Sequence, residues 1–196
     1  MHKVNHTYAY YFATQVLKID TKFKQCVYNL ANIVFGNLLL ILSSKISFFL
    51  PFTPVPITMQ TFAVLFLSTI FGRKAVYIVG LYILEGLTGL PVFAKGAGFG
   101  YLLGPTGGYI IGFLVASYVC GLFSELGYSK SFVKTFFAMV TGNVLIYLFG
   151  IFWLMFYTNF NLLKALMLGV VPFIIGDVFK IVLLTFILPF GWKLIK

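Results

Sequence analysis

The sequence is a series of apolar runs, each close to the length that crosses a lipid bilayer, and the short segments between them carry most of the charge. Charged residues make up 9% of the chain, against about 25% in a typical soluble domain. A helical span needs about 20 predominantly apolar residues, so a chain of 196 residues has room for about six. The sequence therefore predicts an all-α membrane protein with six transmembrane helices, over residues 25–44, 57–71, 75–90, 105–123, 135–157 and 166–189.

The basic residues predict the orientation of these helices. The net charge is +10, but the lysines are scattered between apolar runs, which indicates topology signals in a lipid bilayer and no nucleic-acid partner. If the N-terminus is cytoplasmic, only Lys45, Lys95 and Lys164 fall in connections on the outer side. The positive-inside rule then places both termini in the cytoplasm. Residues 25–192 would form a membrane domain with an outward-facing ligand site, and residues 1–24 a cytoplasmic segment, either an amphipathic surface helix or a disordered tail.

Two connections on the outer side have unusual compositions. Residues 48–60 contain three prolines, which predicts a stiff, extended segment because proline lacks an N–H donor and restricts the residue before it. Residues 86–112, GLTGLPVFAKGAGFGYLLGPTGGYIIG, hold nine of the nineteen glycines. A non-helical segment at membrane depth survives where protein buries it or where it lines a water-filled cavity. This segment is therefore predicted to form the wall or lid of a site, with a flexible surface loop as the alternative.

Three charged residues lie within predicted spans. Asp177 and Lys180 are three residues apart and share one face of the sixth helix. A charge at the centre of a span costs about 2.5–3.5 kcal/mol, and such residues usually face the protein interior and mark a ligand path. A structural ion pair is the alternative for these two. Glu85 lies near the outer end of the third span, where a carboxylate can also reach the membrane surface.

The charges of such a site constrain the ligand that it binds. Asp177, Glu85 and Lys180 together carry one negative charge, so an anionic ligand would need Lys95 nearby or a protonated carboxyl. We therefore expect Lys180 or Lys95 to bind an anionic group, and Asp177 or Glu85 to accept hydrogen bonds from ligand N–H groups. Aromatic walls would come from two residues of the glycine-rich segment, Phe93 and Tyr101, for which ordinary packing is the alternative.

The residue types needed for several other functions are missing from the sequence. Both histidines, His2 and His6, lie in the polar N-terminus, so no histidine-based metal or catalytic site can be assembled in the spans. There is also no GxxxxGK[ST] phosphate-binding loop. We therefore expect no enzyme activity, no metal and no cofactor, and any ATP hydrolysis would take place in partner subunits.

Four motifs carry a resemblance to a known family: PFTPVPITMQT (51–61), LEGLTGLPVFA (84–94), GYLLGPTGGYIIGF (100–113) and GDVFK (176–180). In this order and spacing they resemble the BioY family, the biotin-binding S components of energy-coupling factor (ECF) transporters. The resemblance implies a six-helix S-component fold in a bacterial cell membrane, with biotin as ligand. It also implies partners, namely a transmembrane T component and two ATPase subunits. The family's ligand contacts would fall near Phe93–Tyr101 and at Asp177 and Lys180.

Two positions depart from the family pattern. S components commonly contact the T component through small residues spaced by four on the first helix, but here Ala31 is followed at that spacing by Phe35. Lys95 occupies a position where a small or polar residue is expected. The leading hypothesis is biotin capture and uptake by an S component. The alternatives are a stand-alone proton-coupled vitamin transporter, with Glu85 or Asp177 as its proton site, and an S component for another vitamin.

Overall fold

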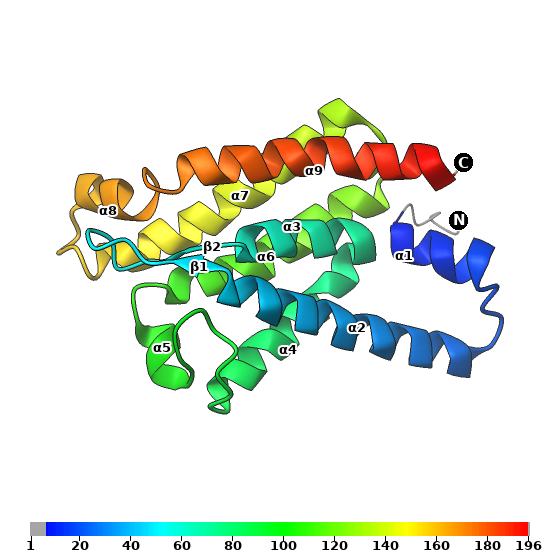
Figure 1. Ribbon diagram of the computed structural model, residues 1–196, viewed down its shortest axis with the longest axis horizontal. Coiled ribbons are helices and arrows are strands. Elements are labelled where there is room, and N and C mark those ends of the chain that lie inside the picture. Colours follow the sequence, from blue (N-terminus) through cyan, green and yellow to red (C-terminus); the bar gives the residue numbers. More distant parts are fainter. Residues whose placement is uncertain (1–6, 196) are drawn as a thin grey trace.

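The apolar runs form helices, because a helix satisfies its backbone hydrogen bonds within one segment and can therefore lie in lipid. The computed structural model describes residues 7–195 (Figure 1). Within that range five helical runs are long and apolar enough to cross a membrane. They are α2 (Lys22–Lys45), the joined pair α3 (Gln60–Phe71) and α4 (Ala75–Leu87), α6 (Gly107–Glu125), α7 (Phe132–Met155) and α9 (Ile174–Ile195). The predicted spans 57–71 and 75–90 thus appear as two helices within one continuous run.

A tight turn separates α3 from α4. The turn η2 (Gly72–Lys74) begins at Gly72, whose φ of 64° is unfavourable for residues with a side chain. Gly121 of α6 lies directly against this turn, and a Cβ atom at Gly121 would lie 2.4 Å from the backbone carbon of Gly72. The turn and α6 therefore pack backbone to backbone, as small residues allow between membrane helices.

The two short strands and the short helix that follows α4 lie at one end of the molecule, and both described ends of the chain lie at the other (Figure 1). The proline-rich connection is extended, as predicted, and its ends pair as an antiparallel ladder between β1 (Ser47–Phe48) and β2 (Ile57–Thr58). The glycine-rich segment, predicted to be non-helical, contains the short helix α5 (Phe99–Leu103). The described part of the chain is mostly helical, as predicted, and the short strand pair forms because two adjacent extended segments can satisfy their backbone groups by pairing with each other.

The sixth predicted span, over residues 166–189, begins in the wrong place. The structure has a separate helix α8 (Leu162–Gly169) and starts α9 at Ile174. Pro172 lies in the break between them, where it supplies no N–H to a continuous helix. As a result Asp177 lies in the first turn of α9.

The N-terminal segment packs against the end of α9. Residues 1–6 lie outside the described range, while α1 (Tyr8–Tyr11) and η1 (Phe12–Val16) are helical. The Tyr8 ring lies 4.4 Å from that of Trp192, and the Tyr11 hydroxyl donates to the Ile195 carbonyl at 3.1 Å. The described part of the segment is thus anchored by side-chain contacts.

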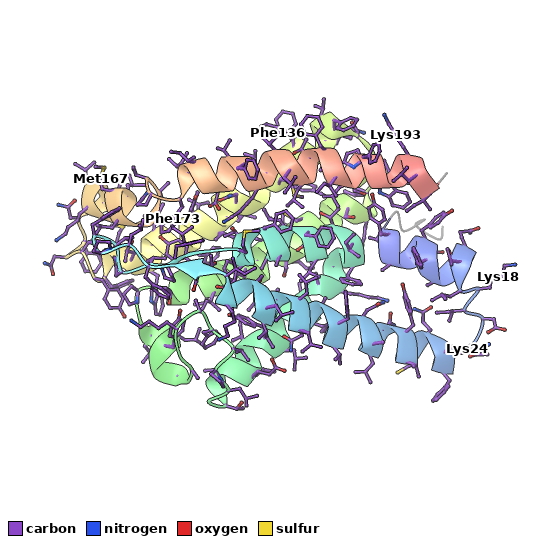
Figure 2. The ribbon with its side chains drawn as sticks, in the orientation of Figure 1. Lys18, Lys24, Phe136, Met167, Phe173 and Lys193 are labelled. Atoms are coloured by element: carbon purple, nitrogen blue, oxygen red, sulfur yellow. The ribbon has the colours of Figure 1, made fainter. Side chains whose placement is uncertain are left out.

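Several lysines lie at the same end of the molecule as the described chain termini. Figure 2 shows Lys18, Lys24 and Lys193 at that end. The turn η3 (Tyr128–Lys130), between α6 and α7, lies there too, because Ser129 accepts a hydrogen bond from Trp192 Nε1 at 3.0 Å.

Candidate ligand-binding site

A cavity lies near the end of the molecule opposite the chain termini. We call it the deep chamber; it encloses about 520 Å³ including its opening. Its apolar wall includes Ile110, Phe113, Ile146 and Phe173, and its polar wall includes Thr58, Gln60, Thr61, Tyr147, Asp177 and Lys180. Residues from β2, α3, α6, α7 and α9 therefore meet in one site.

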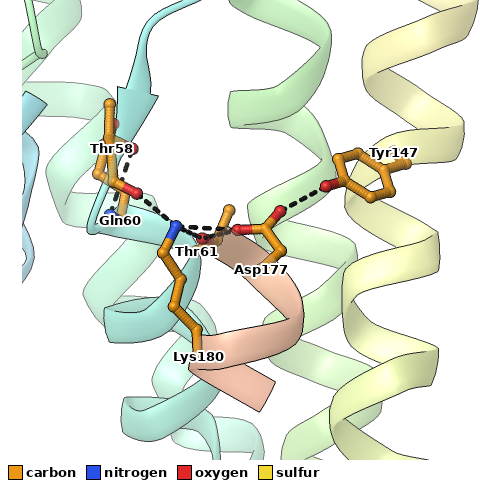
Figure 3. Close-up of polar contacts among 6 residues, drawn as sticks. All are labelled: Thr58, Gln60, Thr61, Tyr147, Asp177 and Lys180. Carbon is orange, nitrogen blue, oxygen red and sulfur yellow. Dashed lines mark hydrogen bonds and ion pairs between the residues drawn. The ribbon is translucent and has the colours of Figure 1, made fainter. Parts of the chain in front are cut away.

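Lys180 is held by three acceptors. Its Nζ donates to the Thr58 carbonyl at 2.7 Å, to Thr61 Oγ1 at 2.9 Å and to Asp177 Oδ1 at 2.8 Å (Figure 3). Only 10% of the Lys180 side chain is exposed. An ammonium group has three protons, so each of them has a protein partner.

Asp177 is the counterion of Lys180 and is 6% exposed in its side chain. Its Oδ1 also accepts from Thr61 Oγ1 at 3.2 Å, and its Oδ2 accepts from the Tyr147 hydroxyl at 2.5 Å (Figure 3). The position in the first turn of α9 favours the carboxylate, because the N-terminus of a helix carries partial positive charge. A carboxylate can accept about four hydrogen bonds, which leaves Oδ2 able to accept another.

The sequence-predicted aromatic residues form two layers. Tyr101 lines the deep chamber, whereas Phe93 is fully buried behind it and stacks on the Tyr101 ring at 4.9 Å. Gly86 makes room for this arrangement, because a Cβ there would lie 2.0 Å from Phe93 Cζ. Burial raises the pKa of Tyr101, while contacts with the Thr106 side chain and the Lys95 backbone oppose that shift.

Glu85 lies apart from the other two intramembrane charges. Its Oε2 accepts a hydrogen bond from Asn37 Nδ2 of α2 at 2.8 Å, and it does not line the deep chamber. The protein charges lining the deep chamber therefore sum to zero, from Asp177 and Lys180. The structure does not bring Glu85 into the negative cluster that the sequence analysis considered.

Lys95 lines a second chamber that adjoins the first. This rim chamber encloses about 630 Å³ including open space, and its wall includes Phe49, Leu50, Thr53 and Pro54. It shares Pro56, Tyr101 and Thr106 with the deep chamber. The Lys95 ammonium lies 5.4 Å from the centre of the Phe49 ring. The two chambers thus meet at a common wall that includes Tyr101.

Sequence reasoning missed three polar residues of the deep chamber. Thr58 and Thr61 lie in the PVPITMQT motif, directly after the prolines, and this position was a usable signal. Tyr147 gave no such signal, because it is one of twelve tyrosines and lies in an apolar run. Among the amide side chains in the apolar runs, Gln60 lines the chamber and donates to the Tyr82 hydroxyl at 2.6 Å, whereas Asn143 does not line it.

The deep chamber has the composition of a candidate binding site. It combines a largely apolar wall with a few fixed polar groups, the usual composition of sites that hold small amphipathic molecules. Across residues 7–195, no three His, Cys, Asp or Glu side chains lie together in a way that could hold a metal ion.

Comparison with known proteins places the chain in a family. The model of the BioY family matches residues 14–196. The biotin transporter BioY of Thermotoga maritima is 40% identical over 141 residues, which cover 70% of this chain and 81% of that protein. The biotin transporter BioY2 of Lactococcus lactis is 34% identical over 175 residues, covering 87% of this chain and 91% of that protein.

A solved structure shares the fold. The crystal structure of the S-component for biotin from an ECF-type ABC transporter matches with a TM-score of 0.79 and 28% sequence identity, covering 89% of this chain and 95% of that chain. The family match, the two relatives and this shared fold agree over most of the sequence. The chain belongs to the BioY family.

Proposed function

We propose that this protein takes up biotin as the substrate-capturing S component of an ECF-type transporter. The observation that carries the proposal is the deep chamber, where the buried pair Asp177–Lys180 lies in an apolar pocket of a fold shared with a biotin S component. The relatives named biotin transporters cover most of this chain and support the same function. The protein itself binds and delivers, and ATP hydrolysis belongs to ATPase subunits that act with a transmembrane T component.

The proposed topology has six membrane crossings with both termini in the cytoplasm of a bacterial cell. The reversal at Gly72 supports separate crossings by α3 and α4, since a residue with φ of 64° ends one helix before the next begins. An even number of crossings agrees with the described chain ends lying at one end of the molecule (Figure 1). The lysines at that end support its cytoplasmic location (Figure 2). The chambers would then open to the exterior.

Calorimetric titration of the purified protein in detergent with biotin tests the proposal. We expect tight one-to-one binding that weakens by about 30-fold or more in Lys180→Ala and in Asp177→Asn, because truncating one partner of a buried charge pair costs about 2–5 kcal/mol in binding. Lys164→Ala is the matched control, because Lys164 is exposed on α8 and lines neither chamber. A folded wild-type protein that does not bind biotin would contradict the proposal.

An uptake assay in cells tests the energy source. Uptake through an S component requires the ATPase subunits, whereas a stand-alone proton-coupled transporter would work without them and stop when a protonophore is added. Uptake that persists after deletion of the ATPase genes would contradict the ECF assignment while leaving biotin as the ligand.

A further inference from the structure

The two chambers together offer a ligand one neutral polar wall and one cation. The deep chamber contains the compensated pair Asp177–Lys180, and the rim chamber contains Lys95. Glu85 lines neither chamber. The net charge of the two lining sets is therefore +1, which a ligand with a single negative charge would neutralise.

Lys180 is poorly placed to bind the negative group. Each of its three ammonium protons already has an acceptor, at 2.7–2.9 Å. A ligand carboxylate could pair with it only by displacing Thr58, Thr61 or Asp177. Displacing Asp177 would bring two carboxylates together in a site with little water, where like charges repel strongly.

Within residues 7–195, Lys95 has no acidic partner. The chain contains four acidic side chains. Asp20 pairs with Lys24, Glu125 with Arg73 and Asp177 with Lys180, and Glu85 accepts from Asn37. The ammonium of Lys95 lies over the Phe49 ring instead, an arrangement that leaves its protons available to an incoming anion.

The shared wall fixes where the two ends of a ligand can lie. Pro56, Tyr101 and Thr106 line both chambers, so a ligand longer than the deep chamber would pass them and end near Lys95. Biotin has the matching polarity, with a bicyclic urea that offers two N–H donors at one end and a flexible chain that ends in a carboxylate at the other.

We propose that Lys95 binds the carboxylate of the ligand in the rim chamber, while one urea N–H group donates to Asp177 Oδ2 in the deep chamber. Lys95 is then a specificity residue that selects the free acid over neutral derivatives, and Lys180 acts by holding Asp177 in place. This inference rests on the proposed function, because the length and polarity of the ligand are those of biotin.

The test compares biotin with biotinamide, which replaces only the carboxylate by a neutral amide. Both ligands are titrated calorimetrically into the full-length protein and into Lys95→Met, Lys95→Arg and the exposed-lysine control Lys164→Met. We expect Lys95→Met to weaken biotin binding by about tenfold, between the effect of an exposed ion pair and that of a hydrogen bond to a charged group. Biotinamide affinity should be unchanged in Lys95→Met, and Lys95→Arg should keep the preference for the acid.

The outcomes separate this inference from the proposed function. Equal losses for biotin and biotinamide in Lys95→Met, or no loss for either, would overturn the role of Lys95 while leaving biotin as the ligand. A preference for the acid that survives in Lys95→Met but disappears in Lys180→Met would reverse the orientation. Wild-type protein that binds neither compound would overturn the proposed function and this inference with it.

Discussion

The buried ion pair between Asp177 and Lys180 predicts a strongly non-additive effect on stability. Lys180→Met keeps the length of the side chain but removes three hydrogen bonds and leaves Asp177 with only Thr61 and Tyr147. Asp177→Leu leaves the ammonium without its counterion. Each single change should destabilise the protein by about 3–5 kcal/mol, because an uncompensated charge remains buried. The double variant should lie within about 1 kcal/mol of wild type, since an apolar pair of similar volume is often neutral or stabilising.

Unfolding in mixed micelles, followed by tryptophan fluorescence, measures the three free energies and completes a double-mutant cycle. The exposed pair Asp20–Lys24, with side chains 69% and 61% exposed, provides the control. Its variants Asp20→Leu and Lys24→Met should combine additively. Additive losses at Asp177 and Lys180, or equal coupling in the two pairs, would refute the reasoning that burial makes this pair costly to break.

The aromatic wall and the Tyr147 contact give two further predictions. Gly86→Ala should destabilise the protein by about 1–3 kcal/mol and weaken biotin binding, because the added methyl group overlaps the ring of Phe93. Gly100→Ala is the control, because a Cβ atom there meets nothing within 4 Å. Equal effects of the two substitutions on thermal unfolding and on biotin titration would contradict the steric explanation. Tyr147→Phe should reduce biotin affinity about tenfold, because it removes one hydrogen bond that positions Asp177. Unchanged affinity in the same titration would show that Thr61 and Lys180 are enough to position Asp177.

The sequence predicts the helices well where one physical requirement dominates. An apolar run in lipid has few alternatives to a helix, and the spans at α2, α6 and α7 were predicted to within three residues at each end. The start of α9 was missed because the residues on both sides of Pro172 are apolar, so hydropathy alone could not show that Pro172 separates two helices.

The sequence predicted those residues of the candidate site whose charged side chains cost free energy inside a membrane span. Asp177 and Lys180 are expensive in a span, and the structure places both in the deep chamber. Phe93 and Tyr147 could not be assigned in this way, because aromatic residues make up 19% of the chain and their position depends on tertiary packing. Glu85 carries the same kind of charge signal, but its contact with Asn37 on another helix was not encoded in any local pattern.

The glycine-rich segment is tied to α2 by hydrogen bonds to its carbonyls. Lys45 Nζ donates to the carbonyls of Pro91 and Phe93, and Ser44 Oγ donates to that of Val92 at 2.6 Å. Any outward displacement of residues 91–93 breaks these bonds and also withdraws the Phe93 ring that supports Tyr101. For a ligand bound in the chambers as proposed, we therefore expect the lifetime to depend on the first membrane helix, and substitutions at Lys45 to change the dissociation rate more than the contacts within the chambers.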